Sequence, residues 1–216
     1  MSEAAGLEGR SAPTARLILT LSGAGALAGI AIVAAFLWTA PRIEANRARA
    51  LRAAIEEVLK QPDRYDTLYV VGGTLAARLP AGADPRRYEQ VYLGYRGDAR
   101  IGFAVTGAEP GFQDVVRLIF GYDPATRAVI GMRVLESKET PGLGDKIEKD
   151  SGFVSEFDRV AVPLVGVKRG QGRGDSAVVD MITGATISSR AVIRIINHRL
   201  ERLEPLLDGY REARAP

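Results

Sequence analysis

The longest apolar stretch of the chain lies near its N-terminus. Leu17–Ala40 is 24 residues without a charged side chain, and as a helix rising about 1.5 Å per residue it would be about 36 Å long. That length spans a hydrocarbon core of roughly 30 Å with some tilt. Trp38 lies near the end of the stretch, where aromatic side chains favour the membrane interface. We therefore predict an uncleaved transmembrane helix.

The residues that flank this stretch bear on its processing and its orientation. A cleaved signal peptide is the alternative, but the stretch exceeds the usual apolar core of roughly 7–15 residues, and Pro41 follows the only small-residue cleavage site. Basic residues slightly favour a cytoplasmic C-terminal part, because Arg10 and Arg16 precede the stretch while Arg42, Arg47, Arg49 and Arg52 follow it. That rule weakens for long translocated domains, so charge alone leaves the side open.

After the predicted transmembrane helix, which we call the anchor, apolar residues again follow helical spacing. Residues 45–61 predict a helix that ends at Pro62 and has one apolar face, formed by Leu51, Ile55, Val58 and Leu59. Residues 63–100 are predicted to be irregular, because their short apolar pieces are interrupted by Gly72, Gly73, Pro80 and Pro85.

From residue 101 the pattern changes to β-branched runs separated by turn signals. Three runs predict strands, at 101–107, 114–123 and 128–137. Asp123-Pro124 is a favourable turn start. We therefore expect an antiparallel hairpin between Val115–Phe120 and Val129–Leu135.

The C-terminal part of the chain mixes helices and strands. Residues 144–157 are predicted to be helical, and 161–167 and 176–182 are predicted strands around a basic, glycine-rich loop at 168–175. A last helix should begin near Ser188 or Ser189 and end at Pro205. Its apolar positions at helical spacing are Val192, Ile195, Ile196, Leu200 and Leu203.

These elements predict an α+β fold, with a single N-terminal transmembrane helix followed by one domain that has a mainly antiparallel sheet and packed helices. The predicted divisions are an N-terminal tail at 1–16, the anchor at 17–40, a helical and irregular connecting region at 41–100, the domain core at 101–205 and a C-terminal tail at 206–216.

The composition narrows the possible chemistry. The chain has no cysteine, which excludes disulfides, thiolate-bound zinc or iron–sulfur clusters and thioether-linked haem. Its one histidine, His198, falls on the polar side of the last helix and is expected to be solvated, so histidine-rich metal sites and serine-hydrolase triads are disfavoured. A formal net charge of +3 predicts no nucleic-acid partner. Redox chemistry would need an organic cofactor or a partner protein.

Two loops have the composition of binding loops. The first is "ESKETPGLGDKIE" at 136–148, where Pro141, Gly142 and Gly144 permit backbone shapes that lay N–H groups against a flat ring or a phosphate. Lys146, just beyond them, would add a positive charge. The alternative is a plain strand-to-helix connection with a solvated lysine.

The second loop is "TGATISS" at 183–189, between a predicted strand and the last helix. A strand, a glycine-containing turn and a helix N-terminus together favour a bound phosphate. The alternative is a helix cap, which needs one hydroxyl, whereas this loop supplies four, on Thr183, Thr186, Ser188 and Ser189. Neither a Walker A nor a dinucleotide-binding glycine pattern is present, so ordinary nucleotide binding is disfavoured.

Together with the anchor, these stretches resemble a known family. "GFAVTGAEPGFQDVVRLIFGYD", "ETPGLGDKIE" and "TGATISS", in this order, look like the FMN-binding domain of the G subunit of Rnf-type electron-transport complexes. The C subunit of the sodium-translocating NADH:quinone reductase is a relative of that protein. The likeness covers residues 17–205, and the two loops at this separation are its specific part.

The resemblance implies a membrane-anchored flavoprotein that relays electrons in an ion-translocating oxidoreductase. It implies covalent FMN, joined by a phosphodiester to the threonine after Gly-Ala, which is Thr186 here, by a separate flavin transferase that uses FAD. Other membrane subunits of the complex are the implied partners, and no acid–base catalytic residue or metal site is implied. The predicted cofactor-binding residues are Thr186, Thr183, Gly184, Ala185, Ser188, Glu139, Thr140, Pro141, Gly142, Leu143, Gly144 and Lys146.

The resemblance also implies a location. Its flavin domain would lie on the periplasmic side of the bacterial inner membrane and its N-terminus in the cytoplasm, against the slight preference of the charge count. Two alternatives remain at this point. One is the flavin subunit of the quinone reductase or of another membrane redox chain, and the other is an anchored scaffold module without a cofactor.

Overall fold

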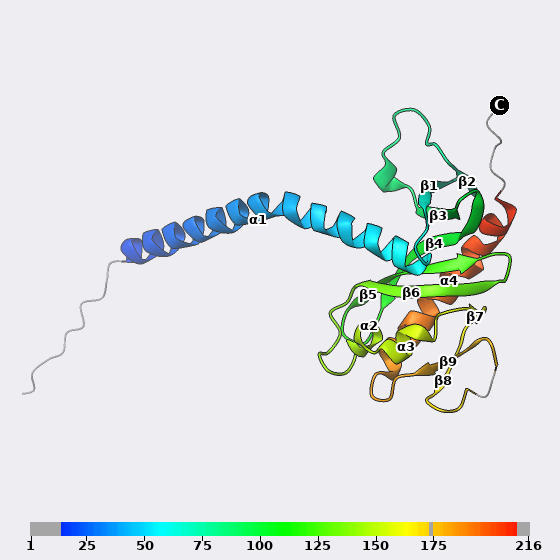
Figure 1. The fold of residues 1–216 in the computed structure, drawn as a ribbon. Helices are drawn as coiled ribbons and strands as arrows, with labels where there is room; N and C mark the ends of the chain where they lie inside the picture. The colour runs from blue at the N-terminus through cyan, green and yellow to red at the C-terminus, as the bar shows by residue number, and fades with distance from the viewer. Residues whose placement is uncertain (1–13, 173–174, 211–216) are drawn as a thin grey trace, which may run out of the picture. The chain divides into compact units, whose positions relative to one another are not determined.

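The computed structural model of the chain describes residues 14–172 and 175–210, drawn as a coloured ribbon in Figure 1. Parts of three predicted segments, the two tails and the loop at 168–175, lie outside these described residues. By packing, the chain divides into two units between Arg49 and Ala50. Its elements in order are α1 (Thr14–Val58), β1 (Arg64–Val71), β2 (Thr74–Ala76), η1 (Pro85–Arg87), β3 (Gln90–Arg96), β4 (Ala99–Pro110), β5 (Val115–Asp123), β6 (Ala128–Glu136), α2 (Lys146–Lys149), α3 (Ser151–Ser155), β7 (Val160–Ala161), β8 (Val165–Lys168), β9 (Val178–Met181) and α4 (Thr186–Gly209).

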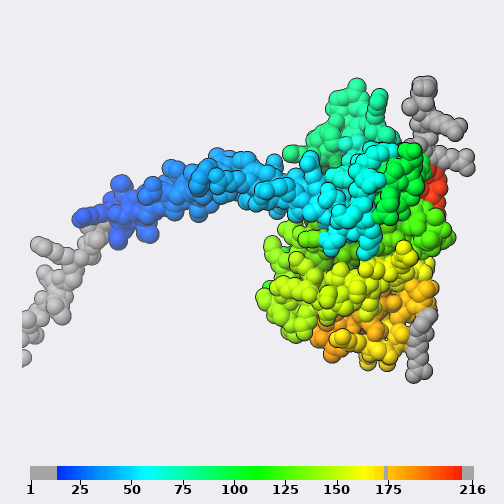
Figure 2. Space-filling view, in the orientation of Figure 1, coloured from blue at the N-terminus to red at the C-terminus, as the bar shows by residue number. Residues whose placement is uncertain are grey.

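The predicted membrane span is helical and lies within α1, which is 45 residues long. By length and composition it is long and apolar enough to cross a membrane. None of its most apolar window is buried among the described residues. Figure 2 shows this part of α1 in blue. The separate helix predicted at 45–61 was wrong in its boundaries, because that segment continues α1 and ends at Val58. Pro41 removes one backbone hydrogen bond, but strong helix formers on both sides carry the helix through it.

Seven antiparallel strands form the main sheet, in the order β2-β1-β3-β4-β5-β6-β7. The prediction that residues 63–100 are irregular was wrong, because β1, β2, β3 and the start of β4 lie there. The predicted hairpin is confirmed by the antiparallel pairing of β5 with β6. The strand predicted at 176–182 is present as β9, whereas the one predicted at 161–167 is divided between β7 of the main sheet and β8, which forms a separate parallel pair with β9. The predicted α+β fold with a mainly antiparallel sheet is confirmed.

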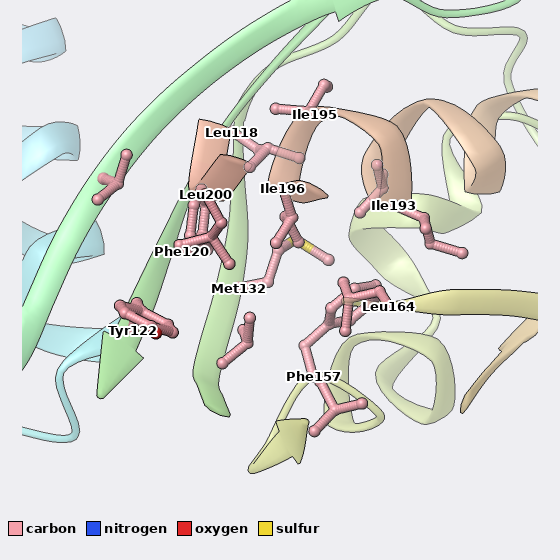
Figure 3. Close-up of a cluster of buried hydrophobic side chains, with 14 of the residues drawn as sticks. Leu118, Phe120, Tyr122, Met132, Phe157, Leu164, Ile193, Ile195, Ile196 and Leu200 are labelled. Carbon is pink, nitrogen blue, oxygen red and sulfur yellow. The ribbon is translucent and has the colours of Figure 1, made fainter. Parts of the chain in front are cut away.

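Side chains alternate between the two faces of the sheet, so each face has its own core. One face packs on α4, where Leu118 and Phe120 of β5 belong to the same buried cluster as Ile196 (Figure 3). The opposite face packs on the last turns of α1, where Ile119 of β5 belongs to a cluster with Ile55. The helical spacing that predicted an apolar face on each of these two helices is therefore confirmed.

Two glycines let the helices approach the sheet closely. A Cβ atom on Gly107 of β4 would lie 2.4 Å from Cγ2 of Ile195 in α4. A Cβ atom on Gly121 of β5 would lie 2.4 Å from the carbonyl oxygen of Val58 in α1. Heavy atoms in packed cores do not approach this closely. Gly107 therefore allows α4 to lie directly on β4, and Gly121 allows the end of α1 to lie directly on β5.

The C-terminal helices differ from the predictions in their boundaries. The helix predicted at 144–157 is two short helices, α2 and α3, which Asp150 separates by accepting hydrogen bonds from the first turn of α3. α4 begins at Thr186, earlier than predicted, and continues through Pro205 to Gly209. Proline lacks one N–H group, and burial of Leu203 and Leu207 on either side of it holds the last turns in place.

Candidate functional site

A hollow of about 320 Å³ lies beside the first turn of α4, and volumes from roughly 300 to 1,000 Å³ are typical of small-molecule pockets. Three segments line it. They are the turn between β4 and β5, the loop between β6 and α2, and the start of α4, which contribute Phe112, then Thr140, Leu143 and Gly144, then Gly184, Ala185, Thr186, Ile187 and Ser188. The two loops singled out in the sequence therefore share one site.

The start of α4 carries free backbone donors beside this hollow. The N–H group of Ser189 makes the first helical hydrogen bond, to the carbonyl oxygen of Ala185 at 2.9 Å. The N–H groups of residues 186–188 precede it and have no partner within the helix. Gly184 has a φ of 86°, so it supplies the left-handed backbone that the turn into the helix needs. Free N–H groups and the helix dipole together favour an anion such as a phosphate here.

Two serines of this turn are used within the protein. The hydroxyl of Ser189 accepts a hydrogen bond from the N–H group of Ile182 at 3.1 Å and donates one to the carbonyl oxygen of Ala185 at 2.9 Å. The hydroxyl of Ser188 donates to the carboxylate of Glu139. Neither caps the helix, because the N-cap residue is Ala185 and no side chain makes a cap hydrogen bond there. The interpretation of these hydroxyls as a plain helix cap was therefore wrong.

The two threonines of the same turn have no such roles. Within the part of the chain that the structure describes, neither the Thr183 nor the Thr186 hydroxyl has a hydrogen-bond partner. Thr183 is exposed and lies outside the lining of the hollow, whereas Thr186 is half-buried and lines it. Thr186 therefore presents the hydroxyl that the fold leaves unused inside the site.

Glu139 joins the three lining segments although it does not line the hollow itself. The residue is only 5% exposed. Its Oε1 accepts hydrogen bonds from the N–H groups of Phe112 and Gln113, both at 3.0 Å, and from that of Asp114 at 3.5 Å, while its Oε2 accepts from Ser188. Burial by itself raises the pKa of Glu139, but the hydrogen bonds from Ser188 and these N–H groups outweigh it and hold the pKa below the usual 4.5. The carboxylate is therefore ionised at neutral pH.

The other predicted site residues lie near the hollow without lining it. Lys146 is the half-buried first residue of α2, and Pro141 and Gly142 are exposed at the tip of the loop. The φ of Gly142 is 77°, so the loop does need glycine there. The structure thus brings seven of the twelve predicted residues together in the lining: Thr140, Leu143, Gly144, Gly184, Ala185, Thr186 and Ser188.

Two lining residues were missed in the sequence. Phe112 and Ile187 line the hollow and are 65% and 52% exposed, which is unusual for large apolar side chains. A signal existed for Phe112, because an aromatic residue directly after Pro110-Gly111 sits in a turn rather than in a strand. Ile187 gave no such signal, because the helix was expected to begin after it.

Comparisons with known proteins bear directly on this site. A family model described as an FMN-binding domain matches residues 111–201, the segment that contains every residue lining the hollow. The chain is 34% identical over 176 residues to the G subunit of the ion-translocating oxidoreductase complex of Cereibacter sphaeroides, with 76% of each protein covered. The chain belongs to the family of these G subunits.

Two further comparisons show how much of the chain is similar to other proteins, one by sequence and one by structure. The G subunit of the ion-translocating oxidoreductase complex of Yersinia pestis is 35% identical over 119 residues, which cover 54% of this chain but only 56% of that relative. The crystal structure of Shewanella oneidensis NqrC superposes with a TM-score of 0.64 over 76% of this chain and 97% of that chain. At 16% identity, this second likeness shows a shared fold alone.

Proposed function

We propose that the protein is a membrane-anchored flavoprotein component of an ion-translocating oxidoreductase complex, and that it carries FMN joined covalently to Thr186 through a phosphodiester. The observation that carries this proposal is the unbonded Thr186 hydroxyl, at the start of a long helix and in the lining of a pocket of small-molecule size. The match to an FMN-binding domain over the same residues supports FMN as the occupant.

The residues around Thr186 fit a phosphate ester. The N–H groups of residues 186–188 are free to bind phosphate oxygens, and the helix dipole stabilises a negative charge at this end by about 0.3–1 kcal/mol at an exposed site. Gly184 and Ala185 leave room on the approach to the hydroxyl, since a Cβ on Gly184 would meet only Leu143, at 3.7 Å. Ser188 and Ser189 are unsuitable acceptors, because both hydroxyls are buried and bonded within the protein.

The attachment is a phosphoryl transfer that needs FAD and a separate flavin transferase. The Thr186 oxygen forms a bond to the phosphorus of the FMN half of FAD, the bond joining the two phosphates breaks, and AMP leaves. The proton of the hydroxyl passes to a base of the transferase or to water. The chain then gains the mass of FMN less one water, and Thr186 serves as an anchor rather than as a catalytic group.

The apolar part of the hollow suits the ring system of a flavin. Phe112, Leu143 and Ile187 are exposed and come from three different segments around the phosphate position. Aromatic and aliphatic side chains of this kind typically line cofactor pockets, with few polar groups to fix orientation. FMN would supply the one- and two-electron chemistry that a chain without cysteine lacks. The protein tethers and orients it between a reduced and an oxidised partner protein.

The membrane and the partners follow from the same proposal. Leu17–Ala40 anchors the protein in the bacterial inner membrane, with the flavin domain on the periplasmic side. Covalent attachment suits that location, because a cofactor lost outside the cell is not replaced. The other membrane subunits of the complex are its electron-transfer partners, and the flavin transferase is its maturation partner.

The test is covalent loading of the full-length protein co-expressed with a flavin transferase. We expect intact-mass measurement to show FMN less one water on the wild-type chain and on Thr183→Val, and none on Thr186→Val. Valine keeps the shape of threonine and removes the hydroxyl, so folding should be unchanged. An adduct that survives Thr186→Val but is lost in Thr183→Val would refute the assignment. Complete absence of bound flavin would instead favour a scaffold role.

A further inference from the structure

A buried negative charge lies directly behind the wall of the hollow. Gly144 forms part of that wall, and a Cβ on it would lie 2.8 Å from Oε2 of Glu139 and 3.0 Å from Oγ of Ser188. Ser188, also a lining residue, donates its hydroxyl hydrogen bond to the same carboxylate. Phe112, a third lining residue, donates its N–H group to Oε1 of Glu139. The carboxylate therefore contacts three lining residues from behind, while its own side chain stays out of the hollow.

This carboxylate has no ion pair within residues 14–172 and 175–210. All four of its hydrogen-bond donors are neutral: three backbone N–H groups of the turn between β4 and β5, and the hydroxyl of Ser188. Lys138 pairs with Asp114 at 3.2 Å and Lys149 with Asp145 at 2.7 Å, and Lys146 makes no ion pair with Glu139 among the described residues. Neutral donors stabilise a charge without cancelling it, so a net negative charge remains beside the hollow.

We propose that Glu139 is a positioning residue with an electrostatic role: its ionised carboxylate holds the three lining segments together and lowers the reduction potential of the bound flavin. This inference rests on the proposed function. Reduction adds negative charge to the flavin, and a nearby anion opposes that addition. Salt and water screen a buried charge far less than an exposed one. The effect should therefore persist at physiological ionic strength.

The test is to neutralise this carboxylate without changing its shape. In the full-length protein loaded by co-expression with a flavin transferase, Glu139→Gln should favour the reduced flavin at least tenfold more than the wild type, which is about 30 mV for a two-electron couple. The matched control is Glu136→Gln in the same segment, where the carboxylate is 48% exposed and screened, so the potential should not change. Potentials are measured by redox titration followed by absorption, and loading by intact mass.

Each outcome separates this inference from the proposed function. A fully loaded Glu139→Gln protein with the wild-type potential would overturn the inference and leave the function standing, and so would an equal rise in both variants. A wild-type chain without covalent flavin would remove the proposed function instead. If Glu139→Gln does not fold, Ser188→Ala decides. The variant removes a hydrogen bond that lowers the pKa of Glu139, so the extra rise in potential that accompanies protonation of this carboxylate should begin at a higher pH than in the wild type. The same dependence of potential on pH in both proteins would contradict the inference.

Discussion

At the start of α4, the role of each hydroxyl depends on its place in the first helical turn. Successive side chains rotate by about 100° around a helix, so Ser188 and Ser189 point into the protein while Thr186 borders the hollow. The sequence pattern could predict the group of hydroxyls but not this division. The helix begins at Thr186, two residues before the expected start at Ser188. Because each residue rotates by about 100°, an error of two residues places side chains on the wrong side of the helix. Resemblance to a family, rather than periodicity, selected Thr186.

Gly144 and Gly142 form a matched pair for testing the loop between β6 and α2. Gly144→Ala would force a methyl group between Glu139 and Ser188, so we expect a loss of about 1–3 kcal/mol in the free energy of unfolding together with poor FMN loading. Gly142→Ala meets open space and costs only the left-handed backbone strain, about 1–2 kcal/mol, with normal loading. Chemical denaturation and intact mass measure both. Equal loading of the two variants would show that the Glu139–Ser188 contact does not shape the site.

The site depends on the hydrogen bonds and ion pairs that join α4 to the end of β4. Glu109, near the end of β4, accepts a hydrogen bond from Nε of Arg194 at 2.5 Å and lies 2.8 Å from Nδ1 of His198. Arg194 also donates to the carbonyl oxygen of Pro110 at 2.7 Å, next to the turn that carries Phe112. His198 was expected to be solvated. Its side chain is 57% exposed, yet it contacts Glu109 and helps to join α4 to β4.

The contacts of Glu109 with Arg194 and His198 predict a pH-dependent contribution to stability. Burial raises the pKa of Glu109, but hydrogen bonds and charges from Arg194 and His198 outweigh it and lower the pKa below the usual 4.5. The unfolded state then binds more protons in acid, so the contribution is present above the unfolded pKa and is lost as pH falls through the folded one. Glu109→Gln should cost about 1 kcal/mol at pH 7, a fall of roughly 2–4 °C in Tm.

Thermal unfolding across pH checks this prediction, with Glu201→Gln on the exposed side of α4 as the control. The difference in Tm between wild type and Glu109→Gln should shrink as the pH is lowered below about 4.5, and the control should differ little at any pH. A Tm difference that stays constant as the pH falls well below 4.5 would show that the ionised form of Glu109 does not stabilise the contact between α4 and β4.

The strands of the main sheet differ in how clearly the sequence predicts them. The hairpin of β5 and β6 was predictable because long β-branched runs flank a clear Asp-Pro turn. β3 was missed because Gly72, Gly73, Pro80 and Pro85 led the whole of 63–100 to be predicted as irregular, and Gly94 within β3 gives the same signal of a break. In the fold that glycine serves packing, since a Cβ there would lie 2.8 Å from Cδ1 of Leu59. Contacts between segments distant in sequence thus decide positions that local pattern assigns to loops.

The proposed function implies an orientation in the membrane that charge alone left open. The arginines that follow the anchor slightly favour a cytoplasmic domain, whereas the proposed function requires the flavin domain in the periplasm. A reporter that folds only outside the cytoplasm, fused after Pro216, should be active in whole cells. A cytoplasm-only reporter at the same position should be inactive. The opposite pair of results would mean that the charge count was right.

Covalent attachment to Thr186 is tested by locating the flavin on the chain. Trypsin should release residues 174–190, which contain Ser176, Thr183, Thr186, Ser188 and Ser189, from protein loaded with the help of a flavin transferase. Tandem mass spectrometry of this peptide reports which hydroxyl carries the added mass of FMN less one water. We expect fragments that place it on Thr186, with Thr183 and all three serines unmodified. Fragments that place the flavin on any other residue of the peptide, or an unmodified peptide from fully yellow protein, would contradict it.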